Sequence, residues 1–301
     1  MLKPNPYLKR LGFADTDRVV VLHADDIGMC QSTVSAYADL VACGSVSSVA
    51  MMTPCSWFPA AAQLYRDHPH SARLDVGVHL TLTSEWNAFR WRPIANTDPG
   101  AGLLDREGFF HRLAAPVQAE AQPEAVEREM QAQIETALAA GLDLTHVDSH
   151  MLTLFHPRFL PAYFRLGQAY GLPAFMLRGD RNDWRREGLN EAEAAELAAL
   201  TEQVEARGLP LFDSFYAMSL SEHEGRLEEG AQALANCPAG LTHFVIHPCA
   251  DTPELRAMAP DWRSRVADLA LFTSEAWSQA VARSGVKVIG YREIRDALRA
   301  G

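Results

Sequence analysis

Apolar runs alternate with amphipathic stretches along most of this chain, and the alternation predicts strands that each lead into a helix. Residues 18–24 form a valine-rich run, which is typical of a parallel strand buried on both faces. Residues 74–83 alternate instead, with Gly77 and His79 on one face. The pattern predicts strands at 18–24, 46–52, 74–83, 142–150, 174–177, 211–215, 242–247 and 286–290.

Helical periodicity fills most of the intervals between these strands. Ser32 is a plausible N-cap for the first helix, and Gly44 follows its end. Helices are predicted at 33–42, 58–68, 123–140, 158–170, 191–206, 222–235, 262–282 and from 292 onward. Roughly eight strand-then-helix units without an internal repeat indicate a parallel α/β sheet, and we expect a closed or nearly closed, TIM-like (β/α) barrel.

One segment, 84–122, departs from this rhythm. It is rich in proline and glycine and contains Trp86, Phe89, Trp91, Phe109 and Phe110. Long loops in compact domains are usually functional or disordered, and the aromatic content argues against disorder. We therefore expect residues 1–301 to form one barrel domain, with 84–122 inserted as a satellite hydrophobic cluster, an oligomer contact or a wall of the substrate site.

Composition limits the binding partners and the cellular location that we expect for the protein. The chain has 301 residues, 48% of them hydrophobic and 22% charged, with a net charge of −11 and no basic block, so nucleic acid is not expected as a partner. Its five cysteines form no CxxC pair, which favours a reduced cytoplasmic protein. The first residues lack the apolar core of a signal peptide, and no run is long enough to span a membrane. A homodimer is left open.

Titratable groups gather where the predicted strands end, which is where barrels of this type carry their active sites. In 142–150 the side chains of His146, Asp148 and His150 share one face. The polar strand ends are Asp25-Asp26, His79, Asp148 with His150, Arg178, Asp213 and His247. Each has a simpler structural explanation; in particular, Arg178 and Asp213 could pair with each other.

Aspartate together with two histidines is a familiar ligand set for a hydrolytic divalent ion. Two adjacent aspartates can divide the work, one binding the metal and the other acting as a base. The spacing alone does not decide between Asp25 and Asp26, and strict alternation places Asp25 on the face of His23. Gly77, two residues before His79, leaves room in the barrel beneath that residue.

Four ordered motifs carry a resemblance to a known family. They are H-A-D-D-I-G (23–28), G-V-H-L-T-L-T (77–83), T-H-V-D-S-H (145–150) and F-V-I-H-P (244–248), followed by W-R-S-R-V-A-D-L (262–269) and G-V-K-V-I-G-Y-R-E-I (285–294). In this combination the chain resembles the YdjC-like (ChbG/HpnK-type) carbohydrate deacetylases, which are related to the polysaccharide deacetylases. The resemblance extends from about residue 17 to 298.

The resemblance implies a distorted β/α barrel that removes acetyl groups from N-acetylated sugars with one divalent metal ion, zinc or magnesium. By position, Asp26, His79 and His150 resemble the metal ligands, Asp25 the general base and His247 the general acid. We expect the substrate to contact Arg178, Asp213, Asp148 and Trp86.

One departure bears on the substrate. Many family members continue the motif around His150 as D-x-H-x-H-x-H, whereas this chain has Leu152 and Leu154 at the two later positions. If the strand continues, both leucines share the face of His150 and favour a glycolipid-like substrate; if it has ended, they pack under the next helix. The alternatives to a deacetylase are another amide or ester hydrolase on the same barrel and a sugar-binding module without turnover.

Overall fold

The centre of the protein is a sheet of parallel strands, described here by a computed structural model that covers residues 4–186 and 188–300. Its seven strands follow the order β4-β3-β2-β1-β6-β5, and β7 pairs with β1. The strands are β1 Arg18–Ile27, β2 Ser48–Met51, β3 Asp75–Leu80, β4 Leu144–Ser149, β5 Ser214–Ala217, β6 Gly240–Ile246 and β7 Lys287–Ile289. The predicted α/β class with parallel strands is confirmed.

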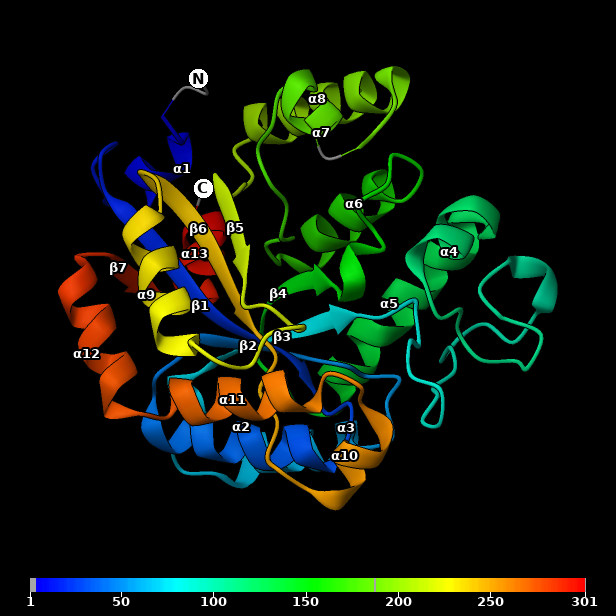
Figure 1. Cartoon of the computed structure of the whole chain (residues 1–301). Coiled ribbons are helices and arrows are strands. Elements are labelled where there is room, and N and C mark those ends of the chain that lie inside the picture. The colour runs from blue at the N-terminus through cyan, green and yellow to red at the C-terminus, as the bar shows by residue number, and fades with distance from the viewer. Residues whose placement is uncertain (1–3, 187, 301) are drawn as a thin grey trace.

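Helices surround the strands, with α2 and α11 side by side on one side of the sheet and α5 and α6 on another (Figure 1). The helices are α1 Pro6–Arg10, α2 Gln31–Cys43, α3 Phe58–Asp67, α4 Ala114–Glu120, α5 Pro123–Ala139, α6 Leu160–Tyr170, α7 Arg181–Arg186, α8 Glu191–Ala206, α9 Arg226–Asn236, α10 Pro253–Met258, α11 Trp262–Phe272, α12 Glu275–Ser284 and α13 Tyr291–Arg299. None of these described helices combines the length and the apolar character needed to cross a membrane.

Irregular segments connect the two ends of the sheet and explain why the barrel is distorted. Next to β4, the Phe175 amide donates to the Val147 carbonyl at 2.9 Å, and the Phe212 amide donates to the Met176 carbonyl at 2.9 Å. The Asp213 amide then donates to Leu241 of β6 at 2.8 Å. Residues 174–177, predicted as a strand, form only isolated bridges, so the ring is completed by short contacts rather than a full ladder.

The two faces of β1 show how the apolar run builds the core. Val20 and Leu22 pack against the outer helices, whereas Val19 and Val21 pack inside the ring with Tyr291. Burying each of these side chains contributes about 1.5–3 kcal/mol, so this strand anchors both layers. The inside packing ends at His23, where the barrel interior becomes polar.

One predicted helix is broken in the structure. The periodicity of 262–282 predicts one helix, but α11 ends at Phe272 and α12 begins at Glu275. Ser274 accepts a hydrogen bond from the Trp277 amide and caps the second helix. A serine hydroxyl competes with the helical backbone for such bonds, and this favours a new start over a continuous helix.

Candidate active site

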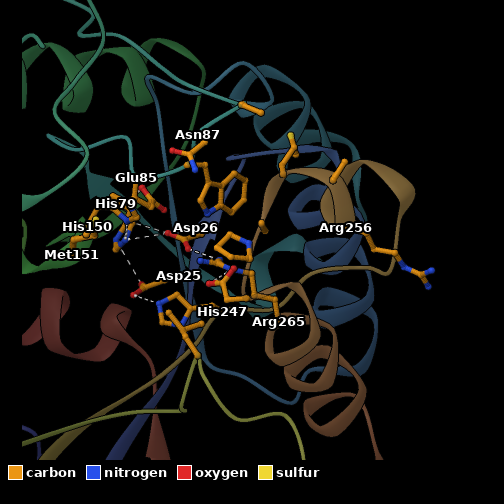
Figure 2. A pocket seen from close by; sticks show the side chains of 18 residues that line it. Asp25, Asp26, His79, Glu85, Asn87, His150, Met151, His247, Arg256 and Arg265 are labelled. Carbon is orange, nitrogen blue, oxygen red and sulfur yellow. Dashed lines mark hydrogen bonds and ion pairs between the residues drawn. The ribbon is translucent and has the colours of Figure 1, made fainter. Parts of the chain in front are cut away.

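The carboxyl ends of β1, β3, β4 and β6 meet at one cavity of about 610 Å³ (Figure 2). Its apolar wall includes Trp86, Met151, Leu220, Met258 and Pro260. Its polar lining includes Asp25, Asp26, His79, Glu85, His150, His247, Asp261 and Arg265. This is the end of the barrel at which the sequence predicted an active site.

Asp25 and Asp26 both reach this cavity although they are neighbours on one strand. Regular alternation would send the two side chains to opposite faces. The β1–β2 ladder is irregular between Ala24 and Ile27, and Asp26 has a φ of 64°, in the left-handed region. Aspartate is one of the few residues that visit this region readily. The backbone irregularity therefore places two carboxylates at one site, which spacing alone cannot reveal.

Asp26, His79 and His150 form a compact group of ligand atoms. Oδ1 of Asp26 lies 3.2 Å from Nδ1 of His150 and 3.5 Å from Nε2 of His79, and these two nitrogens are 3.2 Å apart. Within the described residues, this Asp26 oxygen is buried without a hydrogen-bond partner. One carboxylate oxygen and two imidazole nitrogens are a donor set that suits a divalent ion, so the residues fit the metal that the resemblance implies.

Each histidine of this group is held by a carboxylate on its other ring nitrogen. Nδ1 of His79 lies 2.7 Å from Oδ1 of Asp148, and Nε2 of His150 lies 3.0 Å from Oε2 of Glu85. Metal-binding histidines commonly donate their second N–H to a carboxylate, which fixes the tautomer and turns the free nitrogen toward the ion. The arrangement therefore leaves Nε2 of His79 and Nδ1 of His150 available for a metal.

The charges around the group attract a cation. Burial raises the pKa of Asp26, but Arg265 and His150 outweigh it and hold that pKa well below the usual range. Arg265 donates to Oδ2 of Asp26 at 2.7 Å, so it occupies one carboxylate oxygen and leaves Oδ1 toward the histidines. Burial lowers the pKa of His150, yet Glu85 and Asp26 raise it to about 10. Surroundings that favour a proton on His150 also favour a metal ion there.

Asp25 and His247 lie beside this group and not within it. Oδ2 of Asp25 is 3.8 Å from Nε2 of His247, too far for a hydrogen bond. Burial raises the pKa of Asp25, but His79 and His23 bring it below the ordinary value. Burial also lowers the pKa of His247 below its ordinary value. Both side chains line the cavity, so each can reach a bound molecule.

Two residues expected to contact substrate have other partners. Asp148 bonds His79 at 2.7 Å and lies behind the metal-binding group. Trp86 lines the cavity, but the Arg265 guanidinium lies 5.4 Å above its ring. Trp86 also packs with Phe89 and Trp91. The inserted segment thus supplies both a hydrophobic cluster and part of the cavity wall.

Arg178 and Asp213 do not line this cavity, contrary to the expectation that they bind substrate there. Arg178 donates to Oδ1 of Asp213 at 2.7 Å, which is the mutual ion pair left open from the sequence. Asp213 precedes β5 rather than ending it, and its Oδ2 accepts from the Leu241 amide at the start of β6. The pair therefore lies at the amino end of the strands, away from the polar strand ends.

The space at Gly77 serves His146 and not His79. A Cβ at position 77 would lie 2.4 Å from Nε2 of His146. The His146 ring stacks on Tyr291, with ring centroids 3.7 Å apart. Burial holds the pKa of His146 well below its ordinary value, so the ring is neutral in the barrel interior. His146 is therefore buried beneath the metal-binding group and does not belong to it.

Leu152 and Leu154 do not share the face of His150, because β4 ends at Ser149. Met151 and Leu152 both have a φ of 51°, so the extended conformation does not continue after His150. Leu154 is completely buried, whereas Leu152 remains 39% exposed. Leu152 lines a small pocket of about 90 Å³ next to Asp25 and His247. One leucine thus joins the core, as one alternative predicted, and the other stays beside the cavity.

Glu85, Arg265 and His23 contact the site although sequence reasoning gave none of them a role. Glu85 lies just after the alternating run, in a segment without a steady period. Arg265 comes from α11, far along the chain, and its only signal is its place in the motif W-R-S-R-V-A-D-L. His23 shares a strand face with Asp25, which was the one available sign of contact.

Replacing Glu85 by glutamine should weaken divalent-metal binding by about 10–100-fold, the usual effect of losing an orienting carboxylate. Glutamine keeps the size of the side chain but removes the charge beside His150. Titration calorimetry with zinc would measure the change. Glu120→Gln, at an exposed position of the same inserted segment, is the matched control. An affinity equal to that of the control would contradict an orienting role for Glu85.

Comparisons with known proteins agree with the motifs. The sequence profile described as YdjC-like protein matches residues 19–283. A carbohydrate deacetylase of Thermus thermophilus is 32% identical over 293 residues, which are 97% of this chain and 98% of that relative. A carbohydrate deacetylase of Geobacillus stearothermophilus is 26% identical over 281 residues, covering 92% of this chain and 98% of that relative.

A solved structure gives the same fold. The crystal structure of a candidate cellobiose-phosphate cleavage protein of Enterococcus faecalis matches with a TM-score of 0.74 and 20% sequence identity. The match covers 91% of this chain and 98% of that protein. At this identity the likeness concerns the arrangement of strands and helices.

Proposed function

Because the chain belongs to the YdjC-like protein family, we propose that it is a metal-dependent hydrolase that removes the acetyl group from an N-acetylated carbohydrate. The relatives named carbohydrate deacetylase, which match nearly the whole chain, support this proposal. The observation that carries it is the meeting of Asp26, His79 and His150 beside the separate carboxylate of Asp25. Metal-dependent amide hydrolysis uses such a combination of an electrophilic centre and an independent base.

The metal-binding group would hold one divalent ion, which would polarise the substrate carbonyl and make a water molecule more acidic. Zinc and magnesium are the two candidates, and the two imidazole nitrogens favour zinc. Asp148 and Glu85 fix the rings of His79 and His150, so the ligand atoms are arranged before the ion arrives.

Asp25 and His247 would move the protons. Asp25 is placed to accept a proton from the attacking water, because it lines the cavity without belonging to the metal-binding group. His247, 3.8 Å from Asp25, is placed to give a proton to the departing amine nitrogen. The distance between them leaves both side chains free to face the substrate rather than each other.

The cavity supports a small carbohydrate as substrate. Its volume of about 610 Å³ lies in the range of small-molecule sites, and its lining mixes charged groups with apolar ones. We propose that Trp86 forms part of the wall and that Asp148 acts through His79 without touching the sugar. The cytoplasmic location and the homodimer stay predictions from the sequence.

The test is acetate release from N-acetylated sugars by the metal-free protein before and after addition of zinc or magnesium. Release that depends on added metal would support the proposal. Hydrolysis of other amides or esters without acetate release would favour a different hydrolase on this barrel. Sugar binding without any turnover after metal addition would favour a binding module.

The exposed part of Leu152 favours a substrate with an apolar group beside the acetylated sugar. Covering this leucine and the neighbouring Met151 would contribute about 1–2 kcal/mol, or roughly 5–30-fold in kcat/KM. An alkyl N-acetylglucosaminide should therefore react faster than diacetylchitobiose, and Leu152→His should reduce the difference. Leu138→His, at an exposed position on α5, is the control. Equal rates on both substrates would refute this preference.

A further inference from the structure

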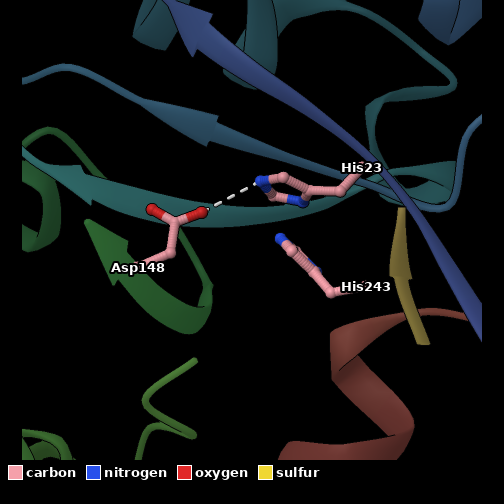
Figure 3. Close-up of side chains that lie close together, drawn as sticks. All are labelled: His23, Asp148 and His243. Carbon is pink, nitrogen blue, oxygen red and sulfur yellow. Dashed lines mark ion pairs between the residues drawn. The ribbon is translucent and has the colours of Figure 1, made fainter. Parts of the chain in front are cut away.

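His23 lies in the barrel interior between two carboxylates from different strands. Its Nε2 is 2.9 Å from Oδ1 of Asp25 on the same strand and 3.0 Å from Oδ2 of Asp148 on β4. Its other ring nitrogen lies 2.6 Å from Oγ of Ser48 on β2. The His23 side chain is completely buried, so bulk water does not reach these contacts. Figure 3 shows its ring facing Asp148, with His243 on the other side.

One N–H group here serves two carboxylates. Within the described chain, Nε2 of His23, Oδ1 of Asp25 and Oδ2 of Asp148 are all buried and make no well-aligned hydrogen bond, although both oxygens lie within 3.0 Å of the nitrogen. The positive charge of the ring then acts on both oxygens without strict alignment, in addition to the charge of His79 on the cavity side. Burial lowers the pKa of His23, but Asp148 and Asp25 outweigh it and raise that pKa to about 9.

Three neighbouring rings inside the barrel do not supply this charge. His146 on β4 and His243 on β6 lie beside it, with ring centroids 5.0 and 4.7 Å away, and burial holds the pKa of both well below the ordinary value. The Tyr291 ring of α13 is 6.0 Å away, and burial raises the pKa of its hydroxyl. His79 on β3 contacts the same two aspartates from the cavity side, and they raise its pKa against the effect of burial, so His23 supplies a second cation from the interior.

Without the cation, Asp25 and Asp148 would compete for His79. Nδ1 of His79 lies 2.7 Å from Asp148 and 3.6 Å from Asp25, and it can offer only one N–H. Two carboxylates that face one N–H group repel each other, so one of them would turn away from His79. Either movement would harm the site: Asp25 would leave its place beside the cavity, or His79 would lose its orientation.

We propose that His23 is a positioning residue that binds Asp25 and Asp148 at the same time and so keeps the base and the orienting carboxylate apart. The proposal rests on the proposed function only in the role of Asp25 as the base; the placement of His23 does not depend on it. Ser48 fixes the ring from the opposite side, at 2.6 Å. His23 would not touch the substrate, because Asp25 lies between it and the cavity.

The first test compares His23→Leu and His23→Gln with wild type in steady-state deacetylation across pH. We expect His23→Leu to lower kcat about 10²-fold with KM and metal content unchanged, which is the scale of a misplaced catalytic group. The acidic limb of its kcat/KM profile should move to higher pH, because removing a cation raises the pKa of the carboxylates beside it. Glutamine retains a donor near the position of Nε2 but carries no charge, so it should recover only part of kcat and leave the acidic limb displaced.

His243→Leu is the matched control, since it removes an equally buried imidazole beside His23 whose hydrogen bond goes to the Tyr291 hydroxyl. It should lower stability without moving the acidic limb. The acidic limbs of the kcat/KM profiles of the two variants are then compared. If His23→Leu lowers kcat but its acidic limb lies at the same pH as that of His243→Leu, His23 has only a structural role and the proposal fails.

A second measurement needs neither activity nor a variant. In ¹⁵N NMR spectra of the metal-free full-length protein, both ring nitrogens of His23 should remain protonated at pH 7.5. A neutral His23 at this pH would overturn the proposal, even if the enzyme is active. If wild type releases no acetate from any sugar, the proposed function fails, and the NMR result still decides whether His23 carries the shared charge.

Discussion

His150→Ala is expected to leave a folded protein that no longer retains a divalent ion and releases no acetate above background. The change removes one of three ligand atoms that lie within 3.5 Å of one another, and it leaves Oδ1 of Asp26 facing His79 alone. The loss of affinity should exceed the 10–100-fold effect of an orienting partner such as Glu85. Elemental analysis of the dialysed protein, together with an acetate assay, measures both effects.

His70→Ala is the control for this experiment, because His70 is exposed and lies outside the site. It should keep the metal content and the rate of wild type. Unchanged metal content in His150→Ala would remove His150 from the ligand set. The adjacent group of Asp25, His79 and Asp148 would then be the better candidate for the metal.

Asp25→Asn should keep the metal and lower kcat by roughly 10²–10⁴-fold, the usual contribution of a positioned general base. Asparagine fills the same space beside His23 but does not accept the proton of the attacking water. Measurement of kcat and metal content in the same preparation separates the two roles of the neighbouring aspartates. Release of metal by Asp25→Asn would show that the base and the ligand have been assigned the wrong way round.

His247→Ala should reduce kcat on a similar scale and alter the basic limb of the pH–rate profile, because that limb reports the group that must be protonated. The backbone amide of His247 donates to Asp268, so the loop around position 247 keeps this anchor when the side chain is removed. A basic limb identical to that of wild type would exclude His247 as the general acid.

The sequence predicted the parallel strands and the end of the barrel at which polar groups gather. Those predictions rest on periodicities that the chain must obey wherever a strand is buried, as in the run before Asp25. The meeting of His79 and His150 follows the same logic, since both stand at or just beyond the carboxyl end of a strand.

The sequence could not reveal contacts that depend on local backbone geometry or on distant segments. The left-handed conformation at Asp26 breaks the alternation that would have separated it from Asp25. The strand ends at Ser149, Leu154 lies in the core and Leu152 lies beside the cavity. Strand alternation continued beyond Ser149 would have placed both leucines on the face of His150, which is wrong. Glu85 reaches His150 from a segment with no regular period at all.

Arg178 and Asp213 show a different limit of sequence reasoning. Each was counted as a polar group at the carboxyl end of a strand, but residues 174–177 form only bridges and β5 begins after Asp213. Because β5 starts at Ser214, Asp213 comes before the strand and not at its carboxyl end. Their ion pair of 2.7 Å belongs to the closure of the ring and not to the cavity.

The most direct test of this account is anomalous X-ray diffraction from crystals of the zinc-loaded protein, collected at the zinc absorption edge. We predict one strong peak within about 2.0–2.2 Å of Oδ1 of Asp26, Nε2 of His79 and Nδ1 of His150. Two other groups of buried side chains could hold an ion: Asp25 with His79 and Asp148, and His23 with Asp148 and His243. A peak at either of these groups, with none at Asp26 and His150, would contradict the proposed metal centre.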